Sequence, residues 1–346
     1  MRVVPQAAPG DPDVLRVGSH LVWALIAAMA GAVMVAYWAA GLTIDYSSLP
    51  AVALVLPICA AVVLFYRFLR PDIGIVYSTE SIAQILLIGF LGALLAYAAA
   101  TLGLPYRDAE LLAADRWLGL DLGAYVAYAD ARPWLALVGV LAYLSMMWQP
   151  AIVFVVLTLT RRIARLHDFA VALAVSLLVT IAIFALCPAL GWYGHLGIDP
   201  AAYPHLQLFW NFAAHLESVR SGALHAIPLG DLRGIISFPS YHTAAAVLAI
   251  WAVWPVRFAR WPMLALNALM VASAPIEGAH YFIDVIGGGV VGAGAVMIAE
   301  WTRHAIRRYC AASTRLRSKT QSAVPSNGKQ SWKDLHAAGA NYEYTT

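Results

Sequence analysis

The amino-acid sequence predicts an all-α, polytopic membrane protein with about eight transmembrane helices. Hydrophobic residues make up 62% of the chain and charged residues only 12%, whereas about a quarter of the residues in soluble globular domains are charged. The mean hydropathy of +0.72 fits a chain that lies largely in lipid. The three cysteines, Cys59, Cys187 and Cys310, form no CxxC pair and indicate neither a disulfide framework nor a thiolate metal site. Composition therefore excludes a disordered chain, a secreted disulfide-rich protein and an ordinary soluble enzyme.

Eight segments approach the length of about 20 mostly apolar residues that a transmembrane helix needs. They are His20–Leu42, Pro50–Phe68, Ser81–Gly103, Trp134–Leu157, Asp168–Cys187, Ser240–Val256, Trp261–Ile276 and Phe282–Thr302. The sixth and seventh are short, and the fourth contains Gln149 and Pro150. The first is too long for the apolar part of a signal peptide, so we interpret it as an uncleaved anchor.

Arginines alternate between the short connections. They precede the first segment, follow the second, fourth, sixth and eighth, and are absent from the first and seventh loops. Because cytoplasmic loops carry the excess of Lys and Arg, we expect both termini in the cytoplasm and the odd-numbered loops outside. Residues 303–346 carry eight Lys or Arg against two Asp or Glu. We interpret this stretch as a basic, lipid-facing tail and expect no nucleic-acid partner.

Two outer loops are long. The third, about Leu104–Pro133, interleaves leucines with acidic residues, which predicts an amphipathic helix. Such a helix lies either in the membrane interface or against the other helices, and the sequence favours neither. The fifth loop, about Pro188–Pro239, holds four histidines at ten-residue intervals that fit no single helix or strand face. The glycine run Gly287–Gly294 lacks the lysine of a phosphate loop and predicts close helix packing instead.

The candidate chemistry lies at the outer ends of the last three segments. "SFPSYHTA" opens the sixth and "GAHYFIDVIGG" opens the eighth. His280 and Asp284 are four residues apart, so on a helix they share one face. Asp284 can then fix the imidazole tautomer of His280 and leave the other nitrogen free to attack. His242 has no adjacent carboxylate and is free to donate a proton. A helix that begins near Ser240 offers unpaired N–H groups to a phosphate, and Ser240 and Thr243 add hydroxyls.

These motifs resemble a known family. Phe238-Pro239-Ser240-Tyr241-His242 and the later His280-xxx-Asp284 resemble the second and third signatures of the type 2 phosphatidic acid phosphatase superfamily. "LLAADRWLGLD" and "GAHYFIDVIGG" resemble the branch that contains fungal inositol phosphorylceramide synthase and many bacterial relatives. The resemblance covers about residues 81–302 and implies a six-helix catalytic membrane core there. Residues 20–80 would add two helices, and residues 1–19 and 303–346 would be cytoplasmic termini, in a bacterial inner membrane.

The resemblance implies a role for each motif residue. His280 would take the phosphoryl group as nucleophile, Asp284 would orient it, and His242 would protonate the leaving oxygen and later deprotonate the acceptor. Ser240, Tyr241 and Thr243 would bind substrate, and neither a metal nor another cofactor would be required.

The sequence also departs from the family pattern. Tyr241 stands where glycine is usual, Glu277-Gly278-Ala279 occupies the place of an expected arginine, and no lysine precedes Lys319 to begin the first phosphatase motif. Arg233 and Arg220 are therefore the candidates for the cationic partners of the phosphate.

Together these features predict a lipid phosphate phosphatase or phosphotransferase, inositolphosphotransferase-like, with its site at the outer membrane face. Its partners would be a lipid phosphate or phosphodiester, water or a polyol or lipid hydroxyl as acceptor, and the surrounding membrane lipids. Two alternatives stay open: a transporter, and a metal-dependent membrane hydrolase that uses the same His242, His280 and Asp284 as ligands.

Overall fold

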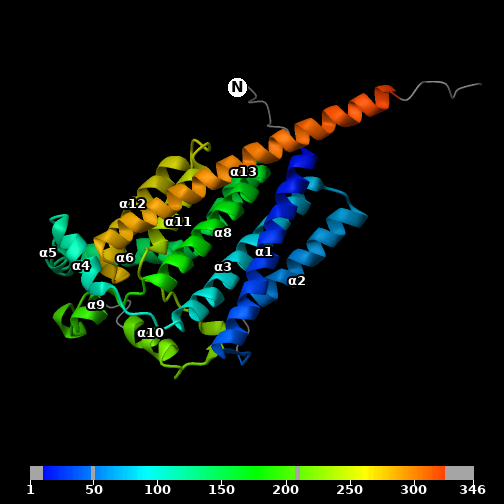
Figure 1. Ribbon diagram of the computed structural model, residues 1–346. Helices are drawn as coiled ribbons and strands as arrows, with labels where there is room; N and C mark the ends of the chain where they lie inside the picture. The colour runs from blue at the N-terminus through cyan, green and yellow to red at the C-terminus, as the bar shows by residue number, and fades with distance from the viewer. Residues whose placement is uncertain (1–10, 48–50, 207–210, 324–346) are drawn as a thin grey trace, which may run out of the picture. The chain divides into compact units, whose positions relative to one another are not determined.

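The structure, a computed structural model, describes residues 11–47, 51–206 and 211–323. The chain divides into two compact units, residues 1–303 and 304–346. The first unit is a bundle of helices (Figure 1), and the second is helical as far as residue 323. Most of the predicted N-terminal segment and tail, residues 1–10 and 324–346, lies outside the described residues.

One half of the bundle consists of α1 (Pro12–Ala40), α2 (Ala51–Leu64), α3 (Ile73–Ala100) and α8 (Ile163–Leu186). A π-helical turn, η1 (Phe65–Leu69), continues α2. The central helix α3 contacts α1, α2 and α8 and carries the main apolar core. Asp72 begins α3 by accepting the Ile75 N–H at 3.0 Å, as a helix N-cap does.

The other half contains α6 (Pro133–Leu144), α7 (Gln149–Leu159), α11 (Tyr241–Val253), α12 (Arg260–Glu277) and α13 (Phe282–Ala323). A short 3₁₀ turn, η2 (Ser145–Met147), separates α6 from α7, and the two helices are bent by 61°. The fourth predicted segment is therefore broken. Pro150 explains the break, because proline has no N–H to donate and its ring clashes with the preceding turn.

The connections at one end of the bundle are themselves structured. They contain α4 (Asp108–Trp117), α5 (Leu122–Asp130), α9 (Gly191–Leu196) and α10 (Phe212–Arg220), with the short turns η3 (Pro200–Ala202) and η4 (Leu229–Asp231). Helices α4, α5 and α9 gather where α13 begins (Figure 1). Strands β1 (Thr43–Asp45) and β2 (Ala226–Pro228) pair in parallel and join α1 to the fifth loop.

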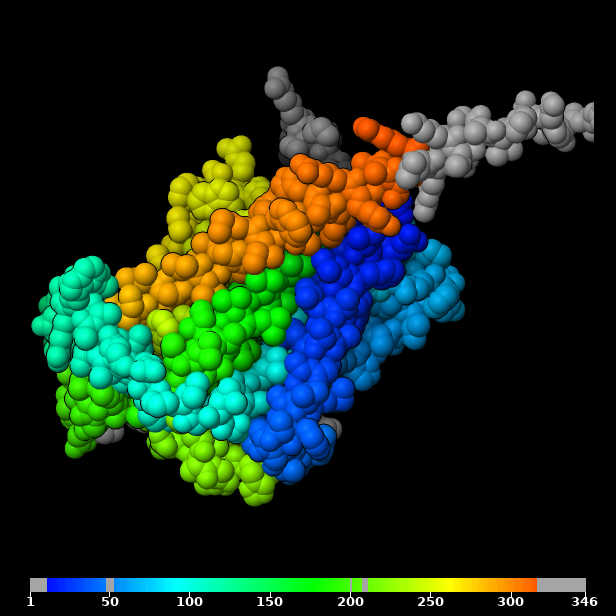
Figure 2. Space-filling model, viewed as in Figure 1, coloured from blue at the N-terminus to red at the C-terminus, as the bar shows by residue number. Residues whose placement is uncertain are grey.

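The surface of the first unit suits lipid. Large apolar side chains more than half exposed occur on several helices, among them Met34, Leu54, Leu137 and Val290. In the space-filling view α13 runs beside α8 (Figure 2), where the Arg303 guanidinium lies 3.8 Å from the Asp168 carboxylate. Contiguous exposed apolar surface is costly in water but favourable in a bilayer. The protein is therefore an integral membrane protein.

Each of the eight predicted segments contains helix in the described residues, but fewer meet the requirements for a membrane span. Among the described residues, four helices are long and apolar enough by themselves, those of α1, α3, α8 and α13. The bent pair α6–α7 makes up to five. Helices α2 and α11 are shorter apolar helices. The counts of eight spans and of six core helices stay predictions.

Candidate active site

His280 and Asp284 form a buried pair at the start of α13. The Nδ1 atom of His280 lies 3.3 Å from Oδ2 of Asp284, and the two residues are 1% and 0% exposed. A carboxylate can only accept, so His280 donates from Nδ1–H, and in the neutral ring Nε2 then keeps a lone pair. The predicted contact between these residues is present.

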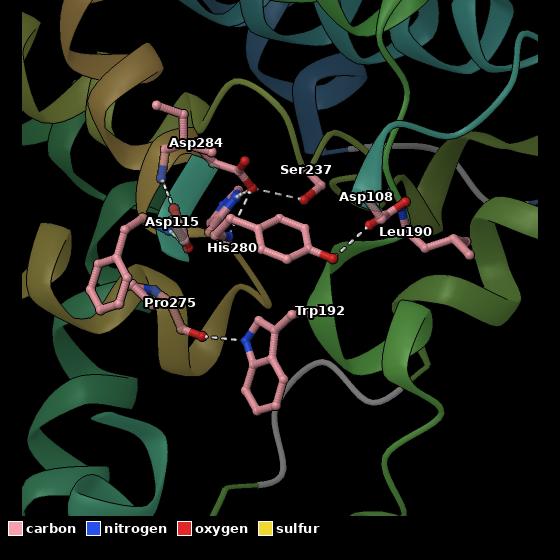
Figure 3. A network of polar contacts seen from close by, with 11 residues as sticks. Asp108, Asp115, Leu190, Trp192, Ser237, Pro275, His280 and Asp284 are labelled. Carbon is pink, nitrogen blue, oxygen red and sulfur yellow. Dashed lines mark hydrogen bonds and ion pairs between the residues drawn. The ribbon is translucent and has the colours of Figure 1, made fainter. Parts of the chain in front are cut away.

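The local geometry of this pair differs from the expected one. His280 does not share a helix with Asp284, because α13 begins at Phe282 and Ala279 has a positive φ of 54°. Instead, Asp284 reaches back across the helix start. Its Oδ2 also accepts the Tyr281 N–H at 3.0 Å and the Ser237 hydroxyl at 3.1 Å (Figure 3). This resembles a capping box, in which the third helical residue binds the residue that precedes the helix.

His242 lies beside this pair at the start of α11. Its ring centroid is 6.2 Å from that of His280, with the rings at 65°. The Tyr143 ring of α6 is stacked on His242 at 3.7 Å between centroids and 21° between planes. The structure thus brings His242, His280 and Asp284 together, as the sequence predicts. It also places the Tyr143 ring against His242, where it restricts the rotation of the His242 ring.

Close contact between α11 and α13 joins the two motifs. The Ser240 N–H donates to the Asp284 carbonyl at 2.9 Å. A Cβ on Gly288 would collide with the Ser240 carbonyl oxygen, so the helices can approach this closely only because Gly288 has no side chain. The glycine run therefore sets the position of His242 relative to His280.

The start of α11 offers hydrogen-bond donors. No side chain caps this helix, and the Ser240 and Thr243 hydroxyls are buried without a hydrogen-bond partner among the described residues. First-turn N–H groups and free hydroxyls are suited to phosphate oxygens. The Tyr241 hydroxyl is also buried without a hydrogen-bond partner among the described residues, but its ring packs against the main apolar core.

The two candidate arginines have other partners. The Arg233 guanidinium binds the Asp231 carboxylate at 2.7 Å. Arg220 donates to the Leu104 carbonyl at 2.7 Å and covers the Tyr106 ring at 4.2 Å from its centroid. The structure does not bring either guanidinium into contact with His242 or His280.

Two carboxylates of α4, not assigned to the site from sequence, support its geometry. Asp115 accepts the N–H groups of Phe282 and Ile283 at 2.8 Å each, which caps α13. Asp108 accepts the Tyr281 hydroxyl at 3.1 Å and the Leu190 N–H at 2.9 Å (Figure 3). Burial raises the pKa of both carboxyl groups above the usual range, while these donors oppose the shift.

This arrangement decides between the two interpretations of the third loop. Asp108, Leu111 and Asp115 are 1%, 7% and 0% exposed, so this face of α4 packs on other helices. Their spacing of three and seven residues places them on one helix face. The sequence signal that could have identified Asp108 and Asp115 is their position on the apolar face of an amphipathic helix.

Replacing Asp115 with alanine is expected to destabilise the fold strongly. The change leaves two N–H groups at the start of α13 without an acceptor, at about 1–3 kcal/mol for each buried group. The matched control is Asp121→Ala, which removes the exposed cap of α5, worth about 1 kcal/mol. Thermal unfolding in detergent compares the two variants, and equal midpoints would contradict the assigned role of Asp115.

The described histidines, cysteines and acidic residues form no group of three or more with the geometry to hold a metal ion. The site instead presents a histidine oriented by a carboxylate, a second histidine at 6.2 Å between centroids, and unpaired donors at a helix start.

Comparison with known proteins places this arrangement in a family. The model of the PAP2 superfamily matches residues 109–298, which is more than half of the chain. The chain belongs to the PAP2 superfamily. Members of this superfamily are phosphatases or phosphotransferases, which supports phosphoryl transfer as the general activity. No curated protein and no solved structure matches the chain.

The extent of the match agrees with the placement of the site. It begins inside α4 and ends inside α13, so it includes Asp115, His242, His280 and Asp284. Helices α1, α2 and α3 precede it. The resemblance to the inositol phosphorylceramide synthase branch stays a prediction.

Proposed function

We propose that this PAP2-superfamily protein is a lipid phosphate phosphatase or phosphotransferase that works through a phosphohistidine on His280. The observation that carries the proposal is the buried contact of His280 Nδ1 with Asp284 Oδ2 at 3.3 Å, with His242 beside it. Hydrogen bonds of this kind are often long before substrate binds and shorten in the reacting complex.

The proposed reaction has two steps. In the first, Nε2 of His280 attacks phosphorus, the P–N bond forms, and the ester P–O bond breaks while His242 donates a proton to the leaving oxygen. In the second, His242 removes a proton from the acceptor hydroxyl, which attacks the phosphohistidine and frees His280. Water as acceptor gives hydrolysis, and a polyol or lipid hydroxyl gives transfer.

The residues around the histidines would stabilise the transferring group. The first-turn N–H groups of α11 and the Ser240 and Thr243 hydroxyls are positioned to bind phosphoryl oxygens. Tyr241 would serve this purpose only through its backbone N–H, since its side chain packs toward α8. Arg233 and Arg220 would have to leave their present partners to contribute.

We propose further that the site faces outward and that the chain has eight spans with cytoplasmic termini. The alternation of arginines supports this orientation. The first phosphatase motif is absent in its standard form, and the residues of the third motif resemble the inositol phosphorylceramide synthase branch. Both observations favour an inositolphosphotransferase-like enzyme, whose acceptor would be a hydroxyl other than water.

The experiment presents purified, vesicle-reconstituted protein with radiolabelled lipid phosphates and phosphodiesters, with and without polyol and ceramide acceptors, in the presence of a chelator. We expect release or transfer of the labelled phosphoryl group. Failure of every substrate, or activity restored by adding back a divalent ion, would contradict the proposal. Cells expressing the protein should also turn over a membrane-impermeant phosphate ester from outside, and turnover only after permeabilisation would place the site on the cytoplasmic side.

A further inference from the structure

The end of the bundle that holds the two histidines has an uneven balance of charge. Four carboxyl groups lie there with exposed fractions of 2% or less, on Asp108, Asp115, Glu277 and Asp284. In the described part of the chain, no ion pair joins a lysine or arginine to any of them. Three of the four accept hydrogen bonds from N–H, hydroxyl or imidazole donors. Glu277 differs, because both of its buried oxygen atoms are without a hydrogen-bond partner among the described residues.

Glu277 belongs to the wall of the site. It ends α12, and its Oε1 lies 3.4 Å from the position of a Cβ on Gly139 of α6. Tyr143, which stacks on His242, is one turn further along α6, and Glu277 interacts electrostatically with its hydroxyl. The next residue, Gly278, lies against both the Tyr143 hydroxyl and the edge of the His280 ring. The residue that follows the unpartnered carboxylate therefore lies between the His280 ring and the tyrosine that stacks on His242.

Aromatic side chains contact the two residues that precede Glu277. Trp192 donates to the Pro275 carbonyl at 2.9 Å (Figure 3), and the Tyr193 hydroxyl donates to the Ile276 carbonyl at 2.7 Å. Pro275 and Ile276 are the two residues that precede Glu277. Tyr193 also interacts electrostatically with Glu277, and its ring lies 3.8 Å from that of Trp192 between centroids. A carboxylate among aromatic rings is the combination that recognises ammonium groups.

From this geometry we infer that Glu277, with Tyr143 and Tyr193, forms a subsite for an ammonium group of the substrate. The inference rests on the proposed function, because the subsite adjoins the phosphoryl-transfer residues. It assigns the substrate to zwitterionic phosphate esters, in which a short alkyl chain links an ammonium to the phosphate, in place of the inositol phosphate ester that the resemblance favours. The phosphate meets His280 and the start of α11, and the ammonium meets Glu277.

Electrostatics favours an ammonium over the other groups that a carboxylate can bind. A buried carboxylate without a counter-charge is costly, and an ammonium supplies both the charge and the N–H donors. A hydroxyl supplies a donor but no charge. A head group with a further phosphate would be repelled by Glu277, and no arginine or lysine among the described residues is paired with the carboxylate to offset that repulsion.

The test compares two short-chain lipids that differ only in the ammonium, phosphatidylethanolamine and phosphatidylethanol. Equilibrium binding to the full chain in detergent is measured with the His280→Ala variant as background, so that neither lipid is consumed. We expect the amine lipid to bind at least about tenfold more tightly, the effect of one charge-assisted hydrogen bond. Glu277→Gln in the same background should remove this preference. Glu110→Gln, an exposed glutamate of α4, should keep it.

Each outcome bears on the inference. Equal binding of the two lipids by the background protein, or a preference that survives Glu277→Gln, would overturn it. Should Glu277→Gln fail to fold, Glu277→Asp keeps the charge but withdraws it by one methylene, and an undiminished preference would also count against the subsite. Binding is measured without turnover. If the preference depends on Glu277 but the protein with His280 intact shows no enzymatic activity, the proposed function is refuted and the subsite stands.

Discussion

Replacing His280 with alanine is expected to abolish both turnover and the covalent phosphoryl-enzyme. His280 is the proposed nucleophile, and its Nδ1 contacts a carboxylate that is fully buried. Loss of a nucleophile in a catalytic unit lowers the rate by more than about 10⁴-fold. Rapid mixing with a labelled aryl phosphate, followed by alkaline quenching and gel analysis, measures the acid-labile label on the protein. The label should be absent from the variant.

His242→Ala separates the second histidine from the first. The variant lacks the proton donor, but an aryl phosphate has a good leaving group that needs little protonation. We expect it still to phosphorylate His280, and the intermediate to accumulate because its hydrolysis lacks a base. Label that persists in His280→Ala, or that is found on His242, would show that the roles are assigned wrongly.

The matched control is His20→Ala, which changes an exposed histidine of α1 far along the chain from both motifs. It should keep full activity and labelling. Thermal unfolding of all three variants separates loss of chemistry from loss of fold, because His280 is buried and its removal leaves a small cavity.

The contact between His280 and Asp284 could be predicted from the sequence because its geometry is local. His280 and Asp284 are four residues apart, and either a helix or a helix start brings them together. His242 followed from a second short motif. The prediction that both residues lie on one helix was wrong. Gly278 and Ala279 lie between α12 and α13, and Ala279 adopts the left-handed conformation.

The supporting residues could not be predicted, because their partners are distant in sequence. Asp115 is 167 residues from Phe282, and Asp108 is 173 residues from Tyr281. No periodicity identifies such pairs. Arg233 shows the opposite case. The sequence predicts its guanidinium as a phosphate ligand, but in the structure the guanidinium binds the carboxylate of Asp231, two residues away. Pro150 is visible in the sequence, but the 61° bend between α6 and α7 is not.

Asp284→Asn is expected to lower the rate by about 10²–10⁴-fold while the protein stays folded. Three donors converge on Oδ2 of Asp284, from His280, Tyr281 and Ser237. An amide oxygen in the same place can still accept from the backbone and the hydroxyl. It carries no charge, however, to stabilise an imidazolium as the ring reacts.

The amide also threatens the tautomer of His280. If its NH₂ group faces the ring, Nδ1 must accept, the proton moves to Nε2, and the lone pair needed for attack is lost. Steady-state turnover of an aryl phosphate measures the effect, with thermal unfolding as the check on folding. The control is Asp130→Asn, which neutralises the carboxylate 3.6 Å from the His205 ring outside the site. A loss below about tenfold, or an equal loss in the control, would show that the charge of Asp284 does not act through His280.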